Sequence, residues 1–82
     1  MKDVPAEILF QFDAQLKREP IPERNHIFYR KWLRFYFDFC QKYHFDETDR
    51  ASLAPFLEKL ADKKQSSQFR RQAEHALSIF VE

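Results

Sequence analysis

Apolar residues recur along the chain at the three- and four-residue spacing that is typical of amphipathic helices. The first segment predicts a helix that begins near Asp3, which can cap it, and ends before Pro20. Its repeating apolar positions are Val4, Ile8, Phe12 and Leu16. One face of this helix should therefore be buried.

The strongest periodic signal runs from about Glu23 to His44, without a proline or glycine to interrupt it. One broad face is apolar and predicts the core side of a long helix. That face comprises Phe28, Tyr29, Trp32, Leu33, Phe35, Tyr36, Phe39, Cys40 and Tyr43. We expect Trp32 to be buried among Phe28, Phe35, Tyr36 and Phe39. The opposite side collects Arg24, Arg30, Lys31, Arg34, Gln41 and Lys42, with Asp38 as its one acid, and Phe37 and Ile27 fall on this polar side.

Two further helices are predicted after an acidic loop, Asp46 to Asp49. The third runs from Ser52, taken as its cap, to Lys64, and the fourth begins at Ser66 or Ser67. The inward stripes are Leu53, Phe56, Leu57 and Leu60 in the third helix, and Phe69, Ala73, Ala76, Leu77 and Phe80 in the fourth. The other face of the fourth helix presents Gln68, Arg71, Gln72 and His75.

Composition favours an all-α fold with one core. The chain has no glycine and four prolines, so the tight turns that join short strands lack their usual residue. Its 82 residues, of which 44% are hydrophobic, leave room for a single domain that spans residues 1–82. We therefore expect one compact bundle of four helices.

The net charge of +1 does not by itself indicate a nucleic-acid partner. Local clustering of cations matters more, because salt screens charges over about 8 Å. No run of 18 uncharged apolar residues exists, and charged residues stand where a signal peptide would be apolar. The single cysteine, Cys40, fits a reducing compartment. We therefore expect a cytoplasmic protein without a membrane segment.

No catalytic, metal or cofactor site can be assembled from the sequence. The three tyrosines, Tyr29, Tyr36 and Tyr43, are spaced by seven on the apolar face and should pack in the core rather than act as nucleophiles. The histidines, His26, His44 and His75, lie on different segments without partners at ligand spacing, so we expect them at the surface. Cys40 lies on the apolar face and should be an inert buried thiol.

The segments Tyr29–Phe39, Phe56–Ala61 and Gln72–Phe80 resemble, in the right order, the second, third and fourth helices of one known domain, the N-terminal SAM-like core-binding domain of phage and integron integrases, which are tyrosine recombinases. In the family's second helix a tyrosine is followed, after two residues, by tryptophan, an aliphatic residue and arginine, as at Tyr29, Trp32, Leu33 and Arg34 here. The similarity extends over roughly Ile8 to Phe80.

This resemblance implies a compact four-helix SAM-like orthogonal bundle that joins a C-terminal catalytic domain in a clamp around the recombination-site duplex. The family's catalytic residues belong to that second domain, so this chain by itself should not be an enzyme. We expect the natural protein to continue beyond Glu82 into a domain that cleaves and rejoins DNA. Double-stranded DNA, the catalytic domain and other recombinase subunits are the implied partners.

Two polar rows are the candidate DNA contacts under this resemblance. They are Arg24, Arg30, Lys31 and Arg34 before and along the second helix, and Gln68, Arg71, Gln72 and His75 on the fourth. Arginine can pair with guanine and glutamine with adenine in the major groove. The alternatives are ordinary solvated helix faces, a protein-interaction module that uses Phe37 and Ile27, and a small enzyme, which has the least support.

Overall fold

The computed structural model describes residues 4–81, and within this range the chain is helical and contains no strand. The helices are α1 (Ala6–Arg18), α2 (His26–Tyr43), α3 (Leu53–Asp62) and α4 (Ser67–Val81). Short 3₁₀ turns precede two of them, η1 (Glu23–Asn25) before α2 and η2 (Arg50–Ser52) before α3. The expectation of an all-α bundle of four helices is confirmed.

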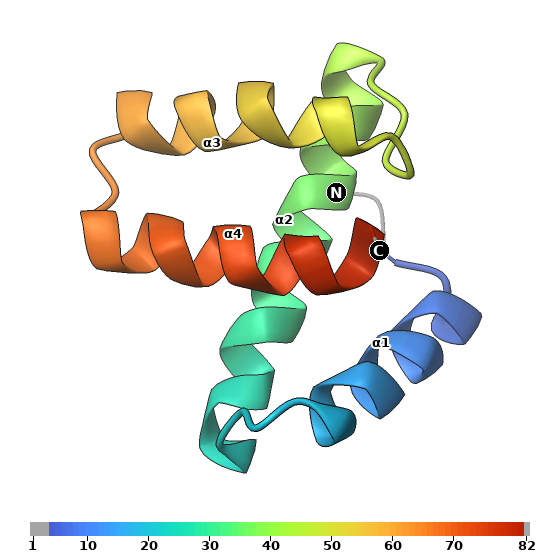
Figure 1. Ribbon diagram of the computed structural model, residues 1–82. Helices are drawn as coiled ribbons and strands as arrows, with labels where there is room; N and C mark the ends of the chain where they lie inside the picture. The colour runs from blue at the N-terminus through green and yellow to red at the C-terminus, as the bar shows by residue number, and fades with distance from the viewer. Residues whose placement is uncertain (1–3, 82) are drawn as a thin grey trace.

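The helices are arranged around α2 and α4 (Figure 1). In that view α3 and α4 lie side by side and run antiparallel, and both cross the long α2 helix. Helix α1 packs against α2 and against α4. Because α4 contacts all three other helices, its polar residues can lie at the boundaries between elements. No helix in the described range is both long enough and apolar enough to span a membrane.

Local hydrogen bonds explain where the helices begin and end without glycine. Helix α2 ends at Tyr43 and is followed by His44, which adopts a left-handed conformation (φ 62°), and Lys64 after α3 does the same. Ser52 stands at the N-cap position of α3, as expected, but its side chain does not cap the helix; the Asp49 carboxylate caps η2 by accepting the Ala51 N–H. The Ser52 hydroxyl instead donates to the Asp46 carbonyl. The predicted cap Asp3 lies outside the described residues.

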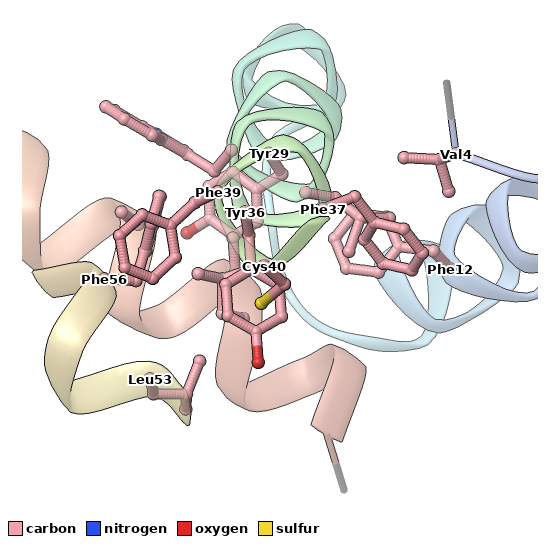
Figure 2. Close-up of a cluster of buried hydrophobic side chains, with 14 of the residues drawn as sticks. Val4, Phe12, Tyr29, Tyr36, Phe37, Phe39, Cys40, Leu53 and Phe56 are labelled. Carbon is pink, nitrogen blue, oxygen red and sulfur yellow. The ribbon is translucent and has the colours of Figure 1, made fainter. Parts of the chain in front are cut away.

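The core draws on all four helices, and Tyr36 lies near its centre (Figure 2). Its ring meets Phe56 and Phe80 at centroid distances of 5.4 and 6.3 Å. Its hydroxyl donates to the Glu47 carbonyl at 3.0 Å, which anchors the loop between α2 and α3. Burial raises the pKa of Tyr36 well above its ordinary value. The hydroxyl therefore stays protonated at neutral pH and serves packing, as predicted.

The buried face of α2 is rotated from the predicted one. Phe37, predicted on the polar side, is 2% exposed, and its ring centroid lies 5.3 Å from that of Phe80. Phe28 and Phe35, predicted in the core, are 46% and 37% exposed. The placement of these three residues was wrong because α1 covers the Phe37 edge of α2, where Phe12 lies beside Phe37 (Figure 2).

Three other side chains differ from the prediction in how far they are exposed to solvent. Tyr43 and Phe69 are exposed although both were assigned to apolar stripes. Each lies at an end of its helix, where fewer neighbours cover it. His26 is buried, not at the surface, and its Nε2 atom hydrogen-bonds the Ile21 carbonyl at 3.2 Å. Cys40 is buried, as predicted.

Candidate nucleic-acid interface

Two side chains of the predicted polar row on α4 are held by buried aromatic residues of α2. The Trp32 indole N–H donates to the Gln72 carbonyl oxygen at 2.8 Å. The Tyr29 hydroxyl lies 2.8 Å from His75 Nδ1. Trp32 and Tyr29 are both buried, whereas His75 is exposed. These four residues and Lys31 are called the α2–α4 seam below.

The hydrogen bond from Trp32 determines what Gln72 can offer to a ligand. Its carbonyl oxygen has accepted the indole proton but retains a second lone pair. Its amide nitrogen has no partner among the described residues. Gln72 can therefore still donate and accept, which is what a two-bond contact with an adenine edge requires.

The hydrogen bond with Tyr29 likewise determines what His75 can offer to a ligand. Burial raises the pKa of Tyr29, so its hydroxyl keeps its proton and can donate to Nδ1. A neutral imidazole that accepts at Nδ1 carries its hydrogen on Nε2. The two rings also meet edge to face at 5.6 Å. His75 can thus present an oriented donor at the surface.

Lys31 brings a positive charge to the seam. Its Nζ atom lies 4.8 Å from the centroid of the Trp32 ring and 5.8 Å from those of Phe28 and Phe35. Aromatic faces attract cations without neutralising them. The structure shows no acidic partner for Lys31 among the described residues. The charge therefore remains available to an anion.

The other predicted cations of α2 lie on the side of the helix that faces α1. Arg30 Nη1 pairs with Asp13 Oδ1 of α1 at 3.0 Å, and both side chains are partly exposed. Arg30 and Arg34 line a depression of about 420 Å³ on the α1 side, together with Lys31, Ile27, Leu9 and Val4. Lys31 is therefore the residue that connects the two sides of α2.

The remaining predicted residues are exposed. Arg24 lies in η1, ahead of α2, and Gln68 and Arg71 lie on α4. Arg71 borders a shallow depression with His75, Glu74 and Ser78. The predicted α4 row is thus continuous at the surface, but only Gln72 and His75 are fixed by contacts with α2.

Sequence reasoning missed a groove between α2 and α3. It has a volume of about 320 Å³, and its charged or exposed lining residues include Phe35, Asp38, Lys42, Tyr43, Lys59 and Lys63. These residues define the α2–α3 groove. The sequence predicts Tyr43 in the core and does not place Lys59 or Lys63 among the candidate DNA contacts, so nothing in the periodicity brings these residues together. The spacing of Lys59 and Lys63, four residues apart on one helix side, was the one available signal.

Two ammonium groups flank the exposed Tyr43 ring in this groove. Lys42 Nζ and Lys59 Nζ lie 5.4 and 5.5 Å from its centroid. A hydrogen bond from Lys59 and the positive charges of Lys42 and Lys59 hold the pKa of Tyr43 below its ordinary value. Lys42, Lys59 and Lys63 thus give the groove more positive than negative side chains. No cluster of metal-ligating side chains occurs among residues 4–81.

Comparison with known proteins identifies the family. No curated protein and no solved structure matches the chain significantly. One family model, described as the phage integrase N-terminal SAM-like domain, matches residues 8–82, which include almost all of α1 and the whole of α2, α3 and α4. The match agrees with the resemblance found in the sequence. The chain therefore belongs to the phage integrase N-terminal SAM-like domain family.

Proposed function

We propose that this chain is the DNA-binding domain of a site-specific tyrosine recombinase and that it grips duplex DNA through the α2–α4 seam. The observation that carries the proposal is the pair of hydrogen bonds that join Trp32 to Gln72 and Tyr29 to His75. They hold an amide and an imidazole of α4, and the Lys31 ammonium lies over the same Trp32 ring that donates to Gln72. Membership of the integrase family supports the same function.

The chemistry of the seam suits duplex DNA because it combines a cation with oriented groups that can donate. In protein–DNA complexes, phosphate contacts fix position and contacts to base edges give specificity. Arg24, Lys31 and Arg34 serve as phosphate anchors in this proposal. Arg30 contributes less, because Asp13 already balances part of its charge.

Base contacts are assigned to α4. The Gln72 amide and the His75 imidazole are each held by a hydrogen bond to α2, and the exposed Arg71 and Gln68 lie on the same helix. Arginine and glutamine are the side chains that best distinguish guanine and adenine in the major groove. Loss of Arg71 or Gln72 would therefore affect a preferred sequence more than random DNA.

The proposed partners follow from the family. A catalytic domain of the same parent recombinase would complete the clamp, and other recombinase subunits would lie nearby on the DNA. Ile27 is 63% exposed beside the α1-side depression and offers an apolar contact for such a subunit. Phe37, the other residue of the protein-interaction alternative, is buried, which weakens that alternative.

Salt dependence of binding tests the proposed function. If Arg24, Lys31, Arg34 and Arg71 each contact one phosphate, affinity for random duplex DNA should fall by about 100-fold between 50 and 200 mM salt, because each contact releases counterions. Fluorescence anisotropy of a labelled duplex measures this fall. Binding that does not change with salt, or no binding at 50 mM salt, would contradict the proposal.

A further inference from the structure

The α2–α3 groove adjoins the α2–α4 seam. Trp32 lines the groove and also donates to Gln72 in the seam. Phe35 lines the groove and lies under the Lys31 ammonium. A strand of DNA that crosses the seam at Lys31 would therefore pass the mouth of the groove.

We propose that the α2–α3 groove is a second phosphodiester-binding subsite, in which Lys42, Lys59 and Lys63 extend the DNA footprint from α2 and α4 onto α3. This inference rests on the proposed function. It departs from the sequence-based expectation, which left the third helix outside the DNA surface. The ligand is one backbone phosphate, or two neighbouring ones, of the bound duplex.

The charges of the groove favour an anion. Three lysines line it against one acid, Asp38. The structure shows no ion pair for any of these four residues among residues 4–81. Two of the ammonium groups lie on the same Tyr43 ring, although like charges repel one another. A phosphate bound in the groove would offset this repulsion, because it would bring negative charge close to the lysines.

The form of the groove suits a nucleic-acid backbone. Buried aromatic and aliphatic side chains, Phe39, Phe56 and Leu60, lie among its lining residues, and the lysines and Tyr43 add polar groups to them. The nucleic-acid backbone matches this lining, because its phosphates are charged and the edges of its sugars are apolar. The acids of α3, Glu58 and Asp62, do not line the groove, so they do not oppose a phosphate there.

Charge-matched variants test the subsite. Lys59→Gln with Lys63→Gln should lower the slope of log affinity against log salt by about two units and weaken duplex binding about tenfold or more at 0.15 M salt. The control, Lys17→Gln with Lys64→Gln, removes the same charge from exposed positions outside the groove and should bind nearly as the unchanged chain does. Circular dichroism should show that both variants remain folded.

A gain of affinity gives a test that unfolding cannot imitate. Asp38→Asn removes the acid of the groove and should tighten binding several-fold, whereas Glu58→Gln, with the same change of charge, should have little effect. The inference is overturned if the lysine pair matches its control, or if Asp38→Asn binds no tighter than Glu58→Gln. If the unchanged chain binds no duplex, the proposed function fails instead. One further outcome would reject the inference. If poly-glutamate competes through Lys59 and Lys63, while replacing these lysines does not change DNA binding, the groove belongs to an acidic protein.

Discussion

Replacing Trp32 with alanine is expected to lower the free energy of unfolding by about 3–5 kcal/mol, which is a large part of the stability of a small domain. Trp32 is 2% exposed, and the substitution would leave a cavity where α2 meets α4. It would also remove the hydrogen bond to Gln72. Urea unfolding followed by circular dichroism measures the change, since the variant lacks the only tryptophan.

Phe35→Ala is the matched control for this prediction. The ring centroids of Phe35 and Trp32 are 6.0 Å apart, but Phe35 is 37% exposed. Its replacement should therefore lower the free energy of unfolding by roughly 1 kcal/mol. Equal losses of stability in the two variants would contradict the assignment of the core. The comparison also tests the rotation of α2, because the sequence alone placed both residues inside.

Removing three cations together should have the largest effect on DNA binding. Arg24→Gln, Lys31→Gln and Arg71→Gln in one chain should lower the salt slope by about three units and weaken duplex binding by roughly 100-fold or more at 0.15 M salt. The physical reason is that three phosphate contacts would no longer release counterions. Anisotropy titrations at several salt concentrations measure both quantities.

The control for this variant is Lys17→Gln, Arg18→Gln and Lys64→Gln, which removes the same charge from exposed positions elsewhere. This control should keep most of the affinity, because salt screens distant charges. If both triple variants lose affinity equally, binding follows total charge and the seam has no special role.

The regular features of the fold were predictable from the sequence, because they follow from local periodicity. The α2 stripe gave a helix that ends at His44, within one residue of the observed end, and it correctly buried Trp32. The segment after Lys64 predicts a helix from Ser66 or Ser67, and the observed α4 begins at Ser67. The family resemblance, based on the order of aromatic and leucine positions, is confirmed over residues 8–82.

Features that depend on the packing of distant segments were not predictable. The rotation of α2 that buries Phe37 depends on where α1 lies. The bond between Trp32 and Gln72 joins residues 40 positions apart, and periodicity carries no information about such pairs. The α2–α3 groove likewise requires the relative placement of two helices, since Tyr43 and Lys59 come from different elements.

The most direct test of the central claim is to map amide chemical shifts while a duplex is added to the labelled domain. The largest changes are expected in the α2–α4 seam, at Lys31, Gln72 and His75, with smaller changes at Arg71. The proposed DNA surface would be contradicted if the shifts were confined to the acidic loop Asp46–Asp49 and the outer side of α3 around Glu58, while the seam and Arg71 did not respond.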